Sequence, residues 1–213
     1  TEQVFVNAAS FAIASRYTDY LQQKEAQSGA STPEPPTGVE VEGKRIFLCL
    51  TAGEDAAALL DVLDSWQAQA TFFCTPEFLE HEGDLLRRMT ATGQAIAILA
   101  DAADPHRSVV EQLEAGNRAT CGKTRLALVE NGTEEDLRAA REAGYRCLAP
   151  DLDRADYALR TISNASSLLQ QVSSYRGNVT VWLGETVNAA GLRAFLSAAE
   201  QTDSQCLAWT ETA

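Results

Sequence analysis

From residue 44 onward, the chain alternates between short, continuously apolar runs and longer stretches in which apolar residues recur every three or four positions. Short continuous runs are typical of parallel strands that are covered on both sides, and the longer period is typical of helices that bury one face. The predicted strands are Arg45–Leu50, Ala70–Cys74, Ala95–Leu99, Arg125–Val129, Arg146–Ala149, Val179–Leu183 and Gln205–Trp209. This alternation predicts an α/β fold of about seven βα repeats, either a compact parallel barrel or a doubly wound sheet.

Four of the predicted helices have recognisable starts. Asp55 is placed to cap the helix after the first strand, and Thr75–Pro76 puts proline at the first position of the next helix. Asp104–Pro105 repeats that arrangement, and Thr133 with Asp136 resembles a capping box. The second of these helices is predicted as one continuous segment, EFLEHEGDLLRRM.

The first part of the chain has a different pattern. Residues 1–27 carry apolar side chains every three or four positions, which predicts a helix with one apolar stripe. Residues 28–43 hold three of the six prolines beside glycine, serine and threonine, a composition typical of a linker. We therefore expect an N-terminal helix at 1–27, a linker at 28–43 and one α/β domain at 44–213.

Composition narrows the possible partners. Seventeen lysine and arginine residues against thirty aspartate and glutamate residues give a formal charge of −13. Such a surface repels phosphate backbones and anionic lipid, so we expect neither a nucleic acid partner nor binding to an anionic membrane face. No apolar run approaches the ~20 residues that a membrane-spanning helix needs.

Several segments, in order and spacing, resemble the polysaccharide deacetylase family with its NodB-type homology domain. The stretch KRIFLCLTAGE from Lys44 is followed by LLDVLDSWQAQATFF and LLRRMTATGQAIAI, and the segment from Gly177 resembles the family's final strand, helix and strand. The family's pattern of T-F-D-D-G-P, then A-T-F-F, then a histidine motif is matched most specifically at Ala70–Phe73. The resemblance implies a distorted parallel (β/α)7-type barrel of the polysaccharide deacetylase and glycoside hydrolase type, with an N-terminal helical appendage.

The resemblance also implies a chemistry. Active members of the family hydrolyse acetyl groups on chitin-like, peptidoglycan or xylan sugars, using zinc or another divalent metal to polarise the carbonyl and activate water. In the family, the first aspartate of D-D-G is the general base, and the second aspartate and two histidines of H-x-x-x-H bind the metal. A histidine of a late L-x-H motif is the general acid.

This chain departs from the family at each of those positions. The base position is Thr51 and the metal-binding carboxylate position is Ala52. The histidine positions fall on Leu99 and Ala103 or, with the gap placed earlier, on Ala100 and Asp104, and the general acid position is Gly184. Methyl and isobutyl groups neither ligate a metal nor transfer a proton. The resemblance therefore implies a pseudoenzyme for which no cofactor is expected.

For such a pseudoenzyme we expect a bacterial extracellular or cell-surface location, with a leader or anchor upstream of Thr1. One hypothesis is a module that binds a glycan, a peptidoglycan fragment or a protein partner at the mouth of the barrel. The residues predicted to contact such a ligand are Thr51, Glu54, Arg125, Asp153, Asp156 and Tyr157. A purely structural module would instead have a mouth filled by apolar side chains, for which Leu50, Leu99 and Leu183 are the candidates.

The alternative hypothesis is a residual or altered metal-dependent hydrolase of acetylated sugars. Its relocated ligands would be Glu54, Asp101, Asp104 and His106. Glu54, Asp104 and His106 also fit ordinary helix starts. An acidic loop, Asp151–Asp156, has the oxygen ligands that Ca²⁺ prefers and also the composition of a solvated loop.

Tryptophans and cysteines complete the list of candidate functional groups. Trp66, near a predicted helix end, is the exposed candidate for stacking on a sugar, whereas Trp182 and Trp209 lie in predicted strands. Five cysteines without a C-x-x-C pair do not support a zinc ribbon. If the protein is exported, Cys121 and Cys147 are the candidates for a disulfide, and the alternative is two separate thiols.

Overall fold

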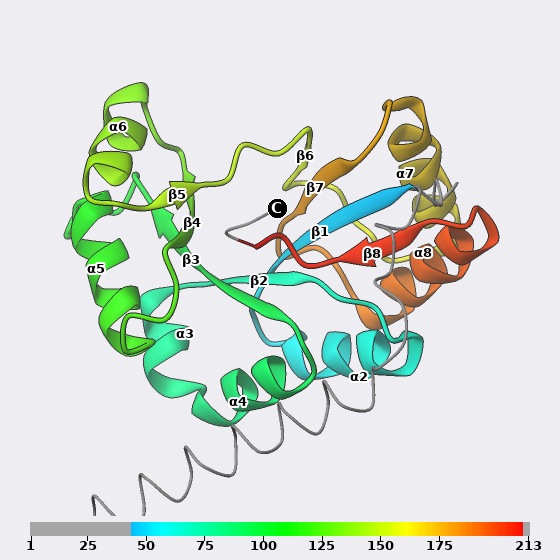
Figure 1. Ribbon diagram of the computed structural model, residues 1–213, viewed down its shortest axis with the longest axis horizontal. Coiled ribbons are helices and arrows are strands. Elements are labelled where there is room, and N and C mark those ends of the chain that lie inside the picture. Colours follow the sequence, from blue (N-terminus) through cyan, green and yellow to red (C-terminus); the bar gives the residue numbers. More distant parts are fainter. Residues whose placement is uncertain (1–43, 211–213) are drawn as a thin grey trace, which may run out of the picture. The chain divides into compact units, whose positions relative to one another are not determined.

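A computed structural model describes residues 44–210, in which eight parallel strands form one curled sheet with helices along its convex side (Figure 1). The strands are β1 (Arg45–Thr51), β2 (Thr71–Cys74), β3 (Ala95–Asp101), β4 (Leu126–Glu130), β5 (Arg146–Cys147), β6 (Leu152–Arg154), β7 (Val179–Leu183) and β8 (Gln205–Leu207). The helices are α2 (Ala56–Trp66), α3 (Pro76–His81), α4 (Gly83–Ala91), α5 (Val109–Ala119), α6 (Glu134–Glu142), α7 (Ile162–Ser174) and α8 (Ala189–Gln201). The predicted N-terminal helix and linker lie outside the described residues.

The strand order is β5-β4-β3-β2-β1-β7-β6, and β8 also pairs with β1. The first half of β1, Arg45–Phe47, pairs with β8, and its second half, Cys49–Thr51, pairs with β2. The first predicted strand therefore neighbours both the second and the last predicted strand. Within the described residues β5 and β6 do not pair, so the sheet is a curled half-barrel rather than a closed one, as a distorted (β/α)7 barrel can be.

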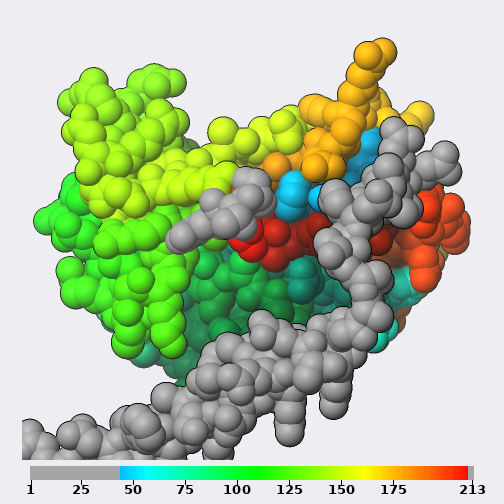
Figure 2. Space-filling model, in the orientation of Figure 1, coloured from blue at the N-terminus to red at the C-terminus, as the bar shows by residue number. Residues whose placement is uncertain are grey.

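Figure 2 shows the two flanks of this open edge as solid surfaces. The green segment around α6 and the orange segment before β7 rise on either side of the yellow-green chain that leads from β5 to β6. The concave face of the sheet is therefore bordered by loops at its open side.

Residues along β1 face alternately toward the helices and toward the concave side, as the two-residue period of a strand requires. Ile46, Leu48 and Leu50 are fully buried in the layer between strands and helices. Cys49 belongs to a second apolar cluster on the concave side, against which Phe47 packs. Both faces of the strand are thus apolar, which explains its continuous apolar run.

Aromatic side chains fill the concave side. The Phe73 ring lies edge-on to Trp182 with centroids 5.2 Å apart, and its centroid is 6.4 Å from that of Trp209 in a stacked arrangement. The Thr71 hydroxyl fixes the last of these residues, since it donates to the Trp209 carbonyl (2.9 Å) and accepts from its N–H (2.7 Å). Trp182 and Trp209 are therefore core residues, as their predicted strands indicated.

Helix starts follow the sequence signals in two of four cases. Thr75 accepts from the Phe78 N–H with proline following it, and Thr133 forms the predicted capping box with Asp136. The third start was placed wrongly, because α5 begins at Val109 after a capping box made by Ser108 and Glu111. Asp55 occupies the N-cap position of α2, but its side chain makes no capping hydrogen bond.

Three further details differ from the prediction. The second predicted helix is interrupted at Glu82, which is the C-cap of α3 and the N-cap of α4. The short strand β6 and helix α7 were not predicted. Only Leu152 of β6 is buried, so this strand carries no continuous apolar run.

The predicted disulfide is wrong. Cys121 is exposed in a turn after α5 with a left-handed backbone (φ 53°), and Cys147 is half-buried in β5; all five cysteines are free. Burial raises the pKa of Cys206 to about 12, so this thiol is an inert part of the core. No helix of the described residues is long and apolar enough to cross a membrane.

Candidate functional site

The carboxyl ends of parallel strands gather the loops on which α/β proteins place their chemistry. Here that edge, called the mouth below, is formed by the ends of β1, β3, β4, β6 and β7 and the loops that follow them. Beneath it lies the apolar cluster of the concave side, called the floor below. Its buried members are Cys49, Phe73, Ala97, Leu99, Leu126, Leu128, Leu148, Trp182 and Trp209.

The prediction that Leu50, Leu99 and Leu183 fill the mouth is only partly correct. Leu99 belongs to it, as expected for a mouth that is filled from below. Leu50 and Leu183 do not, because both lie in the layer between the strands and the helices. The side chains that fill the concave side are instead those at alternate positions, among them Cys49 and Trp182.

The end of β1 carries the base and metal-carboxylate positions that the resemblance implies. Thr51 is 6% exposed, and its hydroxyl has no hydrogen-bond partner. Ala52 is buried in the layer under the helices, and its N–H donates to the Phe73 carbonyl at 2.8 Å. The loop that follows exposes Glu54 and Asp55. This strand end therefore offers one unpartnered hydroxyl and no carboxylate at either inferred position.

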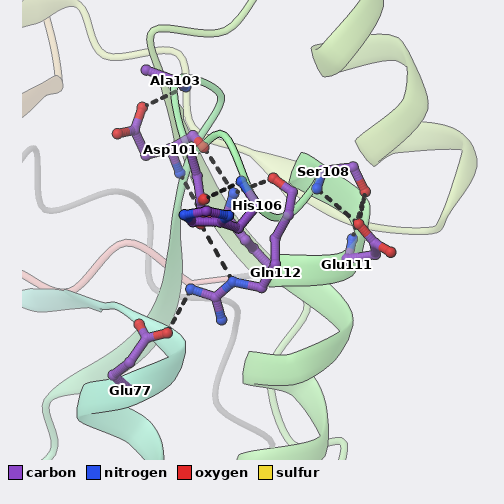
Figure 3. A network of polar contacts seen from close by, with 9 residues as sticks. Glu77, Asp101, Ala103, His106, Ser108, Glu111 and Gln112 are labelled. Atoms are coloured by element: carbon purple, nitrogen blue, oxygen red, sulfur yellow. Dashed lines mark hydrogen bonds and ion pairs between the residues drawn. The ribbon is translucent and has the colours of Figure 1, made fainter.

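The end of β3 carries the inferred histidine positions. Leu99 lies in the floor, Ala100 is fully buried under the helices, and Ala103 is exposed in the loop. Asp101 accepts from the Ala103 N–H at 2.9 Å (Figure 3). It also accepts from the Asn131 side-chain amide at 2.8 Å. Neither placement of the gap therefore brings two metal ligands together.

The loop from Asp104 to Ser108 holds the ligands of the altered-hydrolase hypothesis in other contacts. Asp104 accepts from the His106 N–H at 2.8 Å and from the Arg107 guanidinium at 3.3 Å, and these donors lower the pKa of its carboxyl. Arg107 also pairs with Glu77 of α3 at 2.5 Å. The Asp104 carboxylate is thus already paired with the Arg107 guanidinium. The same arginine ties the loop to α3, so the loop does not turn into the mouth.

Gln112 fixes the same strand end and was not identified from the sequence. Its buried side chain accepts from the Asp101 N–H at 3.0 Å and donates to the Asp101 carbonyl at 2.7 Å and to the Arg107 carbonyl at 3.2 Å (Figure 3). A polar residue on the apolar face of a predicted helix is the signal that could have found it. Its role is to join α5 to the end of β3.

Gly184, at the end of β7, is the position that the resemblance implies for the general acid, and it is sterically closed. A Cβ built on Gly184 would lie 2.5 Å from the carbonyl oxygen of Ala155 and 3.2 Å from its carbonyl carbon, both backbone atoms of the loop after β6. Real Cβ atoms do not approach backbone so closely, so any larger residue requires the loop to move. The packing around Gly184 therefore leaves no space for a histidine side chain at this position.

Four carboxylates lie around the mouth, and this group is called the acidic rim below: Asp101, Glu130, Asp153 and Glu185. Asp101 and Glu130 are paired positions on β3 and β4, each two residues beyond a floor leucine, so both face the concave side. Desolvation, followed by repulsion from Asp101, Glu185 and Asp153, raises the pKa of Glu130. No ion pair of the described residues involves any of the four.

A pocket of about 380 Å³ opens between the loops after β1 and β7 and is called the Thr51 pocket. Its lining includes Thr51, Glu54, Asp55, Gly184 and Glu185. This volume lies within the ~300–1,000 Å³ typical of small-molecule sites. The pocket thus joins the unpartnered hydroxyl to one member of the acidic rim.

The other predicted contact residues lie elsewhere or are engaged. Arg125 precedes β4, at the amino end of the sheet, and its guanidinium lies 5.0 Å from the centre of the Tyr145 ring. The Tyr157 hydroxyl donates to the Asn164 carbonyl at 2.7 Å, which ties it to α7. Asp156 is exposed beside it. Of the predicted contacts, only Arg125 lies away from the mouth, because Asp156 and Tyr157 belong to the loop that follows β6.

Two other candidate features are also explained by local contacts. Asp151 of the acidic loop accepts from the Thr180 N–H at 2.8 Å, and Asp153 accepts from the Ala155 N–H at 3.1 Å. Trp66 is half-buried against the core and lines a hollow at the opposite end of the sheet, beside β8. Neither feature supplies a cation site or a sugar platform at the mouth.

The donor set does not fit a zinc ion. Zinc catalysis requires three protein ligands about 2 Å from the metal. In the described part of the chain, no group of three or more histidine, cysteine, aspartate or glutamate side chains is arranged to hold a metal ion. The inferred ligand positions carry alanine and leucine, and Asp104 is paired with Arg107.

Comparison with known proteins supports the fold. No known family profile and no curated protein matches the sequence. The polysaccharide deacetylase Bc1974 from Bacillus cereus superposes with a TM-score of 0.65 at 18% identity, over 80% of this chain and 94% of that one. The peptidoglycan deacetylase PdaC from Bacillus subtilis superposes with a TM-score of 0.61 at 16% identity, over 80% and 90%.

A further similar structure is a mutant of BA3943, described as a pseudoenzyme of carbohydrate esterase family 4 with restored activity. It superposes with a TM-score of 0.62 at 17% identity, over 79% of this chain and 67% of that one. The described chain therefore has the fold of the polysaccharide deacetylases and family 4 carbohydrate esterases.

Proposed function

We propose that this chain is a catalytically inactive form of the deacetylase fold, a bacterial cell-surface module that binds a glycan at the mouth of its half-barrel. Gly184 is the observation that carries the proposal. It occupies the general acid position, and the backbone of Ala155 takes up the space that an acid side chain would need. A position that had only lost its histidine would still have room for one.

The other inferred positions support the same conclusion. Loss of a general acid or base typically costs about 10²–10⁴-fold in rate. Here the base position is Thr51 and the metal-carboxylate position is Ala52, whose methyl group is buried in the core. The mouth therefore lacks both the metal ligand set and the base that the resemblance assigns to water activation.

Binding, by contrast, has support in the mouth itself. The Thr51 pocket contains a buried hydroxyl with no protein partner, and an unsatisfied buried polar group costs about 1–3 kcal/mol. A ligand hydroxyl would satisfy it. Glycans are rich in hydroxyl groups, and the solved structures with this fold include enzymes named for polysaccharide and peptidoglycan. BA3943, which is described as a pseudoenzyme, is an example of an inactive protein with this fold.

The test is release of acetate from an N-acetylglucosamine tetramer, measured with added Zn²⁺ or Co²⁺ and with an active peptidoglycan deacetylase as positive control. The proposal expects acetate at the level of a blank without protein. Metal-dependent release that disappears with a chelator and with His106→Ala would establish the altered hydrolase instead. Calorimetric titration with the same tetramer then tests binding, and failure of every glycan to bind would leave a structural module.

A further inference from the structure

The acidic rim is chemically one-sided. It consists of four carboxylates, which only accept hydrogen bonds when ionised, and no lysine or arginine of the described residues forms an ion pair with them. Asp101 accepts two hydrogen bonds from neutral amide groups, but its charge is not neutralised. The rim therefore presents uncompensated negative charge above an apolar floor.

Like charges on neighbouring strands oppose folding, so their placement requires an explanation. Asp101 and Glu130 are paired across β3 and β4, and like charges directly opposite each other are destabilising. A ligand that carries positive charge removes this repulsion when it binds. Anionic ligands such as phosphates or uronic acids would increase it.

The spacing of the rim argues against a metal ion as that ligand. A divalent cation needs several oxygen ligands within about 2.6 Å. The four carboxylates come from four separate strand ends, and they do not form a group that could hold a metal ion. Attraction between an ammonium group and a carboxylate, however, extends over the roughly 8–10 Å of the Debye length. A spread of carboxylates thus suits an extended organic cation.

The Thr51 pocket is the second, independent observation. The Thr51 side chain is more than nine-tenths buried, has no partner, and lines the same pocket as Glu185 of the rim. A hydroxyl can donate to a sugar oxygen or accept from an ammonium group. A ligand that combines hydroxyl groups with an amine would satisfy both features at once.

We propose that the mouth recognises the free amine of a deacetylated amino sugar, so that the ligand is a glucosamine-type glycan in its cationic form. This proposal rests on the proposed function and names the chemical group that the site selects. An ammonium group has three donors and no acceptor, which matches a rim that offers acceptors. An N-acetyl group is neutral, so it gains no charge attraction from the four carboxylates. The site thus favours the product of deacetylation over its substrate.

Isothermal titration at low ionic strength and about pH 6, where the sugar amine is charged, compares tetramers of glucosamine and N-acetylglucosamine. The glucosamine tetramer should bind at least about tenfold more tightly, the effect of one charge-assisted hydrogen bond. In the Asp101→Asn/Glu130→Gln variant that advantage should fall by at least about tenfold, while the asparagine oxygen can still accept from Ala103 and Asn131. Affinity for the acetylated tetramer should change little.

The matched control removes the same charge far from the mouth. Glu142→Gln/Glu200→Gln alters two exposed carboxylates at the carboxyl ends of α6 and α8, which lie toward the amino ends of the strands. It should leave both affinities within about twofold, since screening limits long-range effects. Thr51→Val should weaken binding of both tetramers, because the hydroxyl contacts the sugar rather than the charge.

The outcomes separate this inference from the proposed function. Equal or tighter binding of the acetylated tetramer overturns the amine inference and leaves glycan binding intact. Absence of binding by both tetramers overturns both. Tetralysine that binds as tightly as the glucosamine tetramer would indicate a basic peptide ligand instead. Stoichiometric binding of Ca²⁺ or Zn²⁺ that the Asp101→Asn/Glu130→Gln variant abolishes would identify a metal site and also overturn the inference.

Discussion

On β3 and β4, the floor and the acidic rim occupy successive inward positions and have opposite chemistry. On β3 the inward residues are Leu99 and then Asp101, and on β4 they are Leu128 and then Glu130. Two residues after the closely packed leucine, each of these strands carries a carboxylate that forms no ion pair within the described residues. The floor serves stability, whereas the rim is retained at some cost to it. Substitutions in the two layers should therefore have effects of different size and sign.

The largest effect is expected in the floor. Trp182→Ala removes a buried ring (2% exposed) that packs edge-on against Phe73 and should lower the free energy of unfolding by about 3–5 kcal/mol. Trp66→Ala is the control, because that ring is only half-buried, and it should cost less than half as much. Urea denaturation of both variants measures the difference. Equal losses would mean that the floor is not a closely packed layer.

Gly184→Ala tests the closed general acid position. The new methyl group would meet the Ala155 carbonyl, and the required shift should cost about 1–3 kcal/mol. Gly53→Ala is a matched control in the equivalent loop of β1, where a Cβ meets nothing within 4 Å, and it should change stability by less than about 0.5 kcal/mol. A neutral Gly184→Ala in thermal melts would show that the loop after β6 yields easily. It would also remove the main support for a closed site.

Substitution of valine for threonine should change the free energy of unfolding in opposite directions at two positions. Thr51→Val removes an unsatisfied buried hydroxyl and should stabilise the free protein by about 1 kcal/mol. Thr71→Val should destabilise it by about 1–3 kcal/mol, because the backbone N–H and carbonyl of Trp209 lose their partner. Denaturant midpoints compare the two. Destabilisation by Thr51→Val would mean that its hydroxyl already has a partner in solution.

The smallest effect concerns Glu130 and depends on pH. Its pKa is raised above the ordinary value of 4.5, so the folded state binds more protons than the unfolded state between the two values. The contribution of Glu130 to the free energy of unfolding is therefore fully present at low pH, and it is lost as pH rises through the raised pKa. Glu130→Gln should be more stable than the parent at neutral pH, by less than about 1 kcal/mol after screening, and should lose this advantage below about pH 4.

Glu80→Gln, on exposed α3, is the control for that measurement and should show no such dependence on pH. Thermal melts across the pH range compare the variants. An advantage of Glu130→Gln that grows as pH falls would contradict the sign of the effect and the acidic environment inferred for this carboxylate.

The sequence predicted the floor better than the rim. Seven predicted strands were found, because strands apolar on both faces, such as β1 and β3, have continuous apolar runs. Strand β6 was missed because it contains a single buried residue, and α7 was missed because its sequence, ISNASSLLQQVSS, is largely polar. The departures from the deacetylase pattern at Thr51, Ala52 and Gly184 were predicted from the resemblance and stay predictions.

The rim could not be assembled from the sequence in the same way. Asp153 was predicted as a ligand contact and Asp101 as a relocated metal ligand, whereas Glu130 and Glu185 were not considered. Glu130 follows the last inward leucine of β4 by two residues, a spacing that could have indicated it. Its repulsion with Glu185 arises only when the sheet curls and brings separate strand ends together. The steric closure at Gly184 likewise depends on a loop, at Ala155, whose path no periodicity predicts.

The central claim is that the mouth binds a glycan without turning it over, and one titration tests it most directly. Backbone amide shifts in two-dimensional NMR are followed while a glucosamine tetramer or its acetylated form is added, with the acetate signal recorded in the same sample. The account predicts saturable shifts at Thr51, Asp101 and Glu185, none at the far ends of α6 and α8, and no acetate. Shifts confined to other surfaces, or growth of the acetate signal, would contradict it.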